Sequence, residues 1–527
     1  MNPSRVFTIS LFLVLVICQS CMHTKEPERP NILFCIADDA SFPHMGAYGC
    51  DWVISPSFDR IAEEGILFTN AYTPNAKCSP SRACILTGRN TWQLEEACNH
   101  VPNFPSKFKV YTEALNEKGY FTGMTGKGWA PGNPGSIDGK PRQLTGTPFR
   151  DKKLIPPTSG IRDVDYSGNF ADFLGTVPEG EPWCFWYGGF EPHRIYEYGS
   201  GSSIGRKRIE DVDRVPGFWP DTEVTRNDML DYAYEIEYFD KHLGEIIEQL
   251  EKKGILENTL VVVTADNGMP FPRIKGQEYE LSNHLPLAIM WKNGIDQPGR
   301  VVEDFVSFID FAPTFIEVAG LKWEDTGMAP TPGKSLVSFF KSDRETIQLS
   351  RNHVIFGKER HDVGRPDDQG YPIRGIIRDG YLYLKNFEPS RWPVGNPETG
   401  YLNTDGSPTK TLILEMRRQG EDENFWDLNF GKRPEEELYH IAEDPLCLNN
   451  LAGDETLIAL KEELKELLFQ DLLDQEDPRM LGKGDIFDEY EYANEASRDF
   501  YNRYMAGEQI NAGWVEKSDF EKEPIVE

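Results

Sequence analysis

Two short, uninterrupted apolar runs constrain the fold more than any other feature of this chain. The first covers residues 31–37 (Asn-Ile-Leu-Phe-Cys-Ile-Ala), and the second covers residues 260–265 (Leu-Val-Val-Val-Thr-Ala). Runs of this length without polar alternation are typical of strands that are buried on both faces of a parallel sheet. Helical apolar periodicity lies between them, most clearly over residues 227–253. The alternation of strands and helices predicts an α/β sandwich.

Each of these runs is followed by polar side chains that could bind a cation. Asp38 and Asp39 follow the first run, and Asp266 and Asn267 follow the second. The carboxyl ends of parallel strands meet at the edge where open α/β sheets bind ligands. Carboxylate and amide oxygens are suitable ligands for Ca²⁺ or Mg²⁺. Either pair alone could equally be a turn or a helix cap, but two such pairs together favour a metal site.

The chain has 527 residues, which is too many for one ordinary core and favours two domains. After about residue 345 the pattern changes to short strands at 354–357 and 375–385, the second with an Asp-Gly hairpin turn, and an amphipathic helix at 456–473. We predict three parts: a catalytic domain at 31–345, a smaller α+β domain at 346–480, and an acidic, aromatic-rich tail at 481–527. The tail has no assigned role, and an oligomer interface is one interpretation of its aromatic residues.

The N-terminus has the pattern of an export signal. Arg5 precedes an uncharged apolar run at residues 6–17, which has the length of a signal-peptide core and is short for a membrane span. A small residue precedes Cys21, as at a bacterial lipoprotein cleavage site. We therefore predict a signal peptide at 1–20 and a tether at 21–30, with plain secretion as the alternative to a lipid anchor. The expected location is the periplasm or the outer membrane of a bacterium.

The formal net charge of −31 limits the classes of partner. Such a surface repels nucleic acid and anionic lipid, so neither is an expected partner. An anionic substrate would need a local cluster of basic side chains and metal inside its pocket. The cysteines beyond the signal show no C-x-x-C pair and no dense spacing, so they indicate neither a zinc site nor a disulfide scaffold.

A third segment, residues 77–88, combines a cysteine with helix signals. Ser79 is a good N-cap, the proline after it suits the first helical position, and Gly88 is a good helix end. Cys78 would then face the positive end of the helix dipole, where anions are favoured. Arg82 falls in the first turn, where a cation is disfavoured by about 0.3–1 kcal/mol, and this suggests an anionic partner. Taken alone, the segment is equally compatible with an ordinary capped helix.

Together these motifs resemble those of the formylglycine-dependent type I sulfatases. Cys78-Ser-Pro-Ser-Arg82 is similar to the family signature Cys-x-Pro-x-Arg, and the two acidic strand ends are similar to its metal-binding motifs. The resemblance covers about residues 30–475. It implies an alkaline-phosphatase-like α/β/α sandwich with a large mixed central sheet, plus a smaller C-terminal α+β domain with an antiparallel sheet.

The resemblance also implies the chemistry. A formylglycine-generating maturation enzyme would oxidise Cys78 to Cα-formylglycine, whose hydrate attacks sulfur and later expels sulfate. The implied cofactor is one Ca²⁺ per chain, with the ligands Asp38, Asp39, Asp266, Asn267 and the modified Cys78. The implied catalytic residues are Arg82 and Lys127 at the hydrate, Lys275 at the sulfate, and His193 as the acid that protonates the leaving group.

One position departs from the family pattern. Many sulfatases have Lys-x-His where this chain has Lys127-Gly-Trp129, so the expected histidine is a tryptophan. Its role stays open: His100 could replace it, or the hydrate could rely on metal and lysine.

Within the family the chain most resembles the heparan N-sulfatases, or sulfamidases. This resemblance rests on residues 191–194 (Glu-Pro-His-Arg), 266–272 (Asp-Asn-Gly-Met-Pro-Phe-Pro) and 354–361 (Val-Ile-Phe-Gly-Lys-Glu-Arg-His). It implies a sulfated glycosaminoglycan substrate containing N-sulfoglucosamine, with Glu191 and His361 as sugar-binding residues. Alternatively, Glu191 pairs with Arg194, and His361 is a surface residue. An O-sulfatase acting on glucosamine 6-sulfate would need nearly the same residues.

Two other classes compete with this interpretation. Phosphatases and phosphodiesterases of the same scaffold favour a Ser or Thr nucleophile and two zinc ions bound by histidines, which do not cluster here. A non-catalytic binder of sulfated glycans is favoured by Trp129 but opposed by the intact cysteine signature and acidic motifs.

Overall fold

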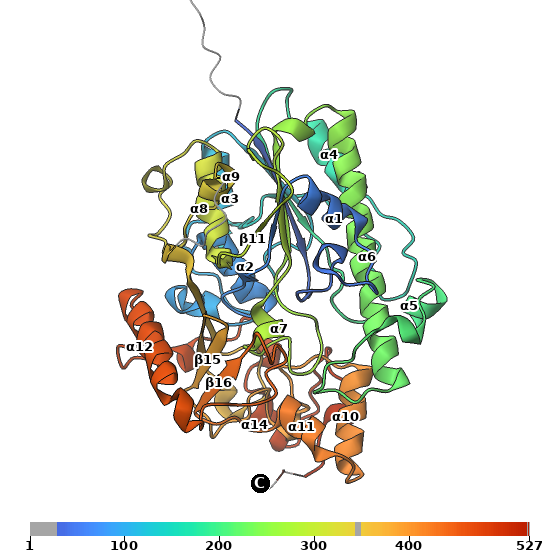
Figure 1. Ribbon diagram of the computed structural model, residues 1–527, viewed down its shortest axis with the longest axis vertical. Coiled ribbons are helices and arrows are strands. Elements are labelled where there is room, and N and C mark those ends of the chain that lie inside the picture. Colours follow the sequence, from blue (N-terminus) through green and yellow to red (C-terminus); the bar gives the residue numbers. More distant parts are fainter. Residues whose placement is uncertain (1–28, 343–348, 524, 526–527) are drawn as a thin grey trace, which may run out of the picture.

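The computed structural model describes residues 29–342, 349–523 and 525 (Figure 1). The predicted signal peptide, Cys21 and most of the tether lie outside these residues. The central sheet has eight strands in the order β11 (Arg300–Val302), β2 (Ile66–Phe68), β10 (Leu287–Met290), β9 (Thr259–Ala265), β1 (Asn31–Ala37), β8 (Trp183–Gly188), β4 (Phe121–Gly126) and β7 (Thr147–Pro148).

The two predicted buried strands are adjacent at the centre of this sheet. Strand β1 runs parallel to both β9 and β8, whereas β10 runs antiparallel to β9 and β2, so the sheet is mixed. In the β1–β9 register, Ala37 lies opposite Ala265. The polar residues that follow the two strands therefore leave the sheet at the same level.

Helices cover both faces of the sheet because alternate side chains of each buried strand point to opposite sides. Leu33 and Cys35 pack on one side, whereas Ile32 and Phe34 pack on the other. Figure 1 shows α1 (Pro56–Glu63), α4 (Tyr166–Thr176) and α6 (Glu223–Lys252) along one face, and α2 (Cys78–Thr87), α3 (Tyr111–Glu117), α8 (Phe311–Val318) and α9 (Val337–Phe340) along the other. This confirms the predicted alkaline-phosphatase-like α/β/α sandwich.

A separate antiparallel sheet forms at the lower end of the molecule in Figure 1, as predicted. Its strands lie in the order β13 (His353–Lys358), β14 (Ile373–Arg378), β15 (Tyr381–Asn386) and β16 (Glu436–His440), and α12 (Ile458–Asp474) packs against it. The predicted Asp-Gly turn joins β14 to β15, and Asp379 and Gly380 both have positive φ angles, 51° and 77°. These angles suit a type I′ hairpin turn.

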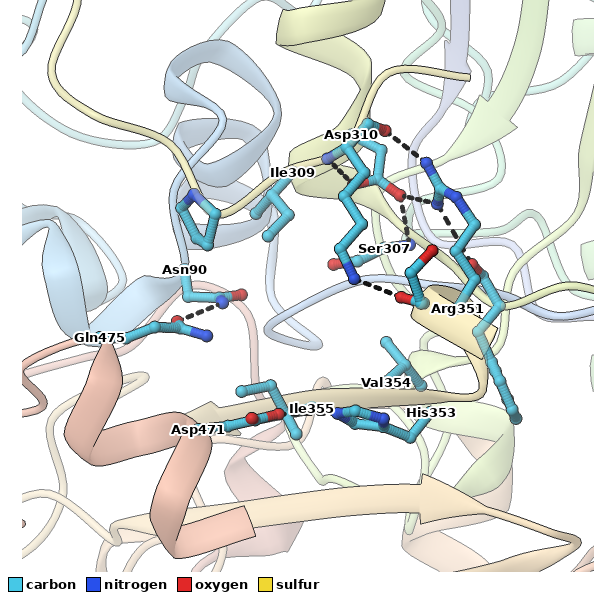
Figure 2. Close-up of a pocket in the computed structure, with 14 residues that line it drawn as sticks. Asn90, Ser307, Ile309, Asp310, Arg351, His353, Val354, Ile355, Asp471 and Gln475 are labelled. Atoms are coloured by element: carbon cyan, nitrogen blue, oxygen red, sulfur yellow. Dashed lines mark hydrogen bonds and ion pairs between the residues drawn. The ribbon is translucent and has the colours of Figure 1, made fainter. Parts of the chain in front are cut away.

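Polar contacts are part of the junction between the two sheets, where a pocket lies (Figure 2). Asn90 donates a hydrogen bond to Gln475 at 2.7 Å, and the Arg351 guanidinium pairs with the buried Asp310 carboxylate at 2.6 Å. Trp92, which comes from the larger part of the chain, also packs in the core of the small sheet. The small sheet is thus held to the sandwich by both ion pairing and apolar packing.

The rest of the C-terminal part lies at the lower end of the molecule in Figure 1 and packs against both the sandwich and the small sheet. Helices α10 (Pro408–Arg418) and α11 (Glu423–Phe430) contribute Ile413 and Phe430 to the same core as α6. In the tail, Tyr492 and Phe500 are buried against Val363 and Leu402. These tail aromatics therefore pack within the chain, while the predicted domain boundaries stay a prediction.

The remaining elements are short. They are α5 (Ser200–Ser203), α7 (Glu280–Asn283), α13 (Ile486–Glu489), α14 (Phe500–Met505), β3 (Ala71–Tyr72), β5 (Ser136–Ile137), β6 (Lys140–Pro141) and β12 (Val306–Ser307), together with several 3₁₀ turns. Within the part of the chain that the structure describes, no helix has both the length and the apolar character needed to cross a membrane.

Candidate active site

Three carboxylates converge at the carboxyl edge of the central sheet. Asp38 and Asp39 follow β1, Asp266 follows β9, and their oxygens lie within 4.8 Å of one another. The backbone N–H of Asp39 donates to Asp266 Oδ1 at 3.0 Å, and each of the three residues is at most 1% exposed. Because the two parallel strands end at the same level, the residues that follow them lie close together, as predicted from the sequence.

Three cations balance these buried carboxylates. Arg82 Nε lies 2.7 Å from Asp266 Oδ2 and its Nη2 lies 3.3 Å from Asp38 Oδ1. Lys127 Nζ lies 2.6 Å from Asp38, and Lys275 Nζ lies 2.7 Å from Asp39. Isolated buried charges would be strongly unfavourable, so the pairing makes the cluster tolerable. From the sequence we expected an anionic partner for Arg82, and in the structure its partners are carboxylates of the chain itself.

The ion pairs also keep the site charged. Burial alone would raise the pKa of Asp38, but the positive charges of Lys127 and Arg82 lower that pKa to about 2. Burial opposes the charge of Lys275, but Asp39 and Asp405 hold its pKa well above the ordinary value. Both groups are therefore ionised at neutral pH.

The donor set fits a hard divalent cation. Asn267 donates from Nδ2 to Asp39 Oδ1 at 2.7 Å, whereas its own Oδ1 is buried without a hydrogen-bond partner. An unsatisfied amide oxygen beside three carboxylates is the kind of oxygen-rich environment that Ca²⁺ prefers. Asp38, Asp39, Asp266 and Asn267 are the residues that would hold the ion.

Cys78 lies at the start of α2, beside the carboxylates. The helix begins at Cys78 itself, with Lys77 as the N-cap, and it ends at Gly88 with φ 68°. The prediction that Ser79 caps the helix was wrong, because Ser79 lies inside the first turn and its Oγ accepts a hydrogen bond from the N–H of Val101 at 3.3 Å. The predicted helix end at Gly88 is confirmed.

The environment of Cys78 disfavours thiolate chemistry. Its side chain is 1% exposed, and the thiol donates to Asp39 Oδ1 at 3.8 Å. Burial raises the pKa of Cys78 well above its usual value. A thiol that stays protonated is a poor nucleophile.

His193 occupies the open side of the cluster, on the loop after β8. Its ring Nδ1 lies 2.6 Å from the carbonyl oxygen of Arg194, so this nitrogen carries a proton, and Nε2 lies 3.9 Å from Asp39 Oδ2. Its side chain is 33% exposed, while Asp39 is fully buried. His193 can therefore contact a ligand that enters from solvent.

Comparison with known proteins agrees with this geometry. The pattern of the family described as Sulfatase matches residues 30–321, more than half of the chain. The chain belongs to the sulfatase family. Enzymes of this family hydrolyse sulfate esters and generally use formylglycine and a divalent metal.

Individual relatives are distant but similar over most of their length. An ulvan-active sulfatase from Formosa agariphila is 25% identical, over 88% of this chain and 81% of that protein. Human N-sulphoglucosamine sulphohydrolase is also 25% identical, over 91% of this chain and 96% of that protein. A solved structure of a protein in complex with its substrate D-glucosamine-2-N,6-O-disulfate has a TM-score of 0.61 at 20% identity, covering 85% of this chain and 98% of that one. At that identity, the structural similarity shows the fold alone.

Two residues that were predicted to bind the sugar, Glu191 and His361, lie outside the cluster. The Glu191 carboxylate accepts hydrogen bonds from Tyr166 Oη at 2.7 Å and from the N–H of Arg162 at 3.0 Å, and the residue is 1% exposed. The alternative pairing of Glu191 with Arg194 was wrong, because Arg194 pairs with Asp228 at 2.7 Å. In the structure Glu191 supports the loop that carries His193.

His361 is fully buried rather than at the surface. Its Nε2 lies 2.7 Å from Asn75 Oδ1 and its Nδ1 lies 3.2 Å from the carbonyl oxygen of Gly276. Burial, together with the nearby charge of Lys358, places the pKa of His361 well below its ordinary value. The alternative of a surface histidine was wrong, because the loop after β13 folds inward against the loop that carries Lys275.

The tryptophan that replaces the family histidine supports the helix. The indole N–H of Trp129 donates to the carbonyl oxygen of Ser79 at 3.0 Å, and its ring packs edge-on against Phe104. His100, the suggested replacement, places Nδ1 2.7 Å from Asp362 Oδ1, while its Nε2 is buried without a hydrogen-bond partner. Trp129 itself supplies no base.

Sequence reasoning missed two carboxylates from the C-terminal part of the chain. Asp405 Oδ2 lies 2.7 Å from Lys275 Nζ, and its carboxylate is within 4.8 Å of ligand atoms of Asp39 and His193. Asp362 lies 2.9 Å from Lys77, the residue before Cys78. In the sequence, Asp405-Gly is typical of a simple turn, so no local signal pointed to the site.

Proposed function

We propose that this protein removes sulfate from N-sulfoglucosamine residues of heparan-type glycosaminoglycans, using a formylglycine derived from Cys78 and a bound Ca²⁺. One observation carries the proposal: Cys78 lies at a helix start beside four oxygen-donating side chains, with two lysines and His193 directed at the same space. A sulfate group needs this combination of nucleophile, positive charge and acid.

Each side chain has a role that its position suits. Lys127 and Lys275 would bind sulfate oxygens, since both ammonium groups lie at the carboxylate cluster next to residue 78. One hydroxyl of the hydrated residue 78 would form the bond to sulfur while the bond from sulfur to the sugar nitrogen breaks. The attacking hydroxyl would pass its proton to the Asp39 carboxylate, which the Cys78 thiol contacts at 3.8 Å. The sugar nitrogen would take a proton from Nε2 of His193 in its imidazolium form, which carries protons on both ring nitrogens. The carbon–oxygen bond to the sulfate would then break while the second hydroxyl gives its proton back to Nε2, which would restore the aldehyde and the acid.

The helix arginine has a holding role in this scheme. Arg82 is fully buried, and besides its two carboxylate partners it donates to the carbonyl oxygens of Lys127 and Gly128, each at 2.8 Å. It therefore ties α2, β1, β9 and the loop of Lys127 together. A Ca²⁺ held by Asp38 and its neighbours would supply Lewis acidity to the sulfate oxygens.

The choice of the N-sulfated sugar rests on similarity. The human sulphohydrolase matches nearly its whole length, and the motifs at residues 191–194 and 266–272 resemble those of the N-sulfatases. An O-sulfatase acting on glucosamine 6-sulfate is the second candidate, because the structural neighbour holds a sugar with both N- and 6-O-sulfates. A decayed, glycan-binding sulfatase is the third, and only Trp129 favours it.

The cellular setting is part of the proposal. The apolar run before Cys21 supports export, with a lipid anchor or plain secretion, and maturation of Cys78 requires a formylglycine-generating enzyme in the host. The described residues do not include this N-terminal segment, so its processing is to be tested by mass measurement of the mature protein.

The decisive test is sulfate release by calcium-loaded protein whose formylglycine content has been verified by mass. N-sulfoglucosamine and glucosamine 6-sulfate are compared at equal concentration. Faster release from the first supports a sulfamidase, and faster release from the second supports the O-sulfatase. Release from neither, with formylglycine present, would contradict both glucosamine assignments.

A further inference from the structure

The tail contacts the loop that brings Asp405 to the reaction centre. We call residues 400–407 the Asp405 loop, and the structure describes residues 481–523 and 525 of the tail. Asp405 is buried, and its Oδ2 lies 2.7 Å from Lys275 Nζ. Its carboxylate is also within 4.8 Å of ligand atoms of Asp39 and His193. A contact that fixes this loop therefore also fixes one of the two carboxylates that hold Lys275.

Trp514 of the tail binds the Asp405 loop on both sides of Asp405. Its indole N–H donates to the carbonyl oxygen of Leu402 at 2.7 Å, and its own carbonyl oxygen accepts the N–H of Gly406 at 2.7 Å. A loop that is bonded at both positions has few backbone conformations left. The carboxylate of Asp405 is therefore kept where it meets Lys275.

A buried ion pair connects the same loop to the end of the tail. Lys410 Nζ lies 3.0 Å from Asp519 Oδ2, and both side chains are fully buried. The ammonium group also donates to the carbonyl oxygens of Gly400 and Thr404, at 2.9 and 2.8 Å. Burial lowers the pKa of Lys410, and the charge of Asp519 opposes this effect. The tail thus supplies the negative charge that lets a buried ammonium group hold the Asp405 loop.

The tail also contacts the loop that carries Asp362. Tyr492 Oη donates to Asp362 Oδ1 at 3.1 Å. Val363 and Leu402, which belong to the two loops, pack with Tyr492 and Phe500 in one buried cluster. Both aromatic residues are 2% exposed, so their rings contact these loops rather than a second copy of the chain.

We propose that the tail is a positioning element of the reaction centre: Trp514 and Asp519 fix the Asp405 loop, and Asp405 in turn holds the ammonium group of Lys275 where sulfate binds. This inference rests on the proposed function, which assigns sulfate oxygens to Lys275. Trp514 and Asp519 are positioning residues, because they act on Lys275 through Asp405. Without the tail contacts, Lys275 would keep only Asp39, 2.7 Å away, which draws it toward the carboxylate cluster and away from sulfate.

The first arm of the test separates positioning from stability. KM and kcat for the sulfated sugar, and the Kd of inorganic sulfate, are measured on calcium-loaded protein with verified formylglycine. We expect Trp514→Ala to raise KM and Kd by about tenfold and to change kcat by at most about twofold, because a contact made to sulfate throughout the reaction is weakened. A substitution that merely lowered the folded fraction would reduce kcat per mole of protein and leave KM unchanged.

A conservative variant and a matched control accompany Trp514→Ala. Trp514→Phe keeps the ring but loses the indole N–H, so KM and Kd should rise by only about threefold. Tyr490→Ala removes a tail aromatic that packs in the core of the small sheet. It should lower the melting temperature and leave KM and Kd at their wild-type values.

The second arm measures the loop directly. Hydrogen–deuterium exchange of the peptide that covers residues 400–407 is followed by mass spectrometry in the same proteins and in Asp519→Asn. In the wild type the N–H of Gly406 is bonded to Trp514. We expect exchange to be faster by about tenfold in Trp514→Ala and Asp519→Asn, because the loop opens more often, and unchanged in Tyr490→Ala.

The outcomes keep the two proposals apart. Wild-type exchange in Trp514→Ala, or faster exchange with unchanged KM and Kd, would overturn the positioning role while sulfate release continues. An equal rise of KM in Tyr490→Ala would overturn it as well. If the wild type released no sulfate from any sulfated sugar but bound inorganic sulfate, and only Trp514→Ala weakened that binding, the proposed function would fail and the positioning role would stand.

Discussion

The reaction centre has two walls that differ in origin. One wall consists of Asp38, Asp39 and Asp266 at the ends of neighbouring strands, with Cys78 at the start of α2. The other consists of Asp362 and Asp405, which come from loops of the C-terminal part and pair with Lys77 and Lys275. The first wall is set by the register of the central sheet, whereas the second depends on how the C-terminal part packs.

Because of this difference, we expect the two walls to have different roles. The sheet-end wall holds the proposed nucleophile and the candidate metal ligands, which tolerate little displacement because the charges are buried and close together. The loop wall contributes Asp405, which pairs with Lys275. We therefore expect substitutions in the first wall to abolish turnover and substitutions in the second to reduce it selectively.

The largest expected effect is at Cys78. Cys78→Ala should lower sulfate release by at least about 10³-fold because no group remains to attack sulfur. Its melting temperature should stay close to that of the wild type. Cys84→Ala, which removes another buried thiol of α2, is the control and should retain activity. Substantial turnover by Cys78→Ala would refute the nucleophile assignment.

Removal of one cluster carboxylate should affect both metal and fold. Asp266→Ala leaves Arg82 short of a partner, and breaking a buried pair in this way costs about 3–5 kcal/mol in the free energy of unfolding. Calcium content is measured by elemental analysis and stability by urea unfolding, with the surface variant Asp163→Asn as the control. One calcium per chain and full activity in Asp266→Ala would exclude this residue as a ligand. Chelation of the wild type should likewise abolish turnover.

A smaller, selective effect is expected in the loop wall. Asp405→Asn leaves Lys275 paired with Asp39 but removes its second carboxylate. We expect kcat/KM to fall by about 10–100-fold, as for other residues that orient a ligand-binding group, with less destabilisation than in Asp266→Ala. Asp422→Asn, an exposed position, serves as the control. If Asp405→Asn matched Cys78→Ala in its loss of activity, the proposed division between the walls would fail.

The smallest effect on turnover is expected at His361. Its pKa is lowered in the folded protein, so below the unfolded pKa of 6.5 only the unfolded state readily takes up the proton. The free energy of unfolding should therefore decrease as pH falls from 7 to 5, by at most about 1.4 kcal/mol per pH unit from this residue.

Urea unfolding of His361→Gln across this range should lack that component, since glutamine does not titrate, with kcat/KM near the wild-type value. Wild-type stability combined with a large loss of turnover would instead place His361 in the sugar site.

Much of the first wall could be predicted from the sequence because its determinants are local. A buried strand has a recognisable apolar run, and the residues after it lie at the sheet edge whatever else the chain does. Asp38, Asp39, Asp266 and Asn267 were found in this way, and the cysteine signature placed Cys78 and Arg82. Even here the helix cap was misassigned, because the helix starts after Lys77, whose side chain makes no capping bond but whose carbonyl oxygen accepts the N–H of Ser81.

Only the tertiary structure determined the positions of the residues in the second wall. It also determined which partners Glu191 and His361 contact. Asp405 lies 130 residues from Lys275 in the chain, and nothing in an Asp-Gly turn indicates that it will meet a buried ammonium group. Glu191 and His361 carried suitable chemistry in the sequence, yet burial gave them internal partners. Local pattern determines which element a residue joins, whereas the packing of distant elements determines whether its polar group faces a ligand or another part of the protein.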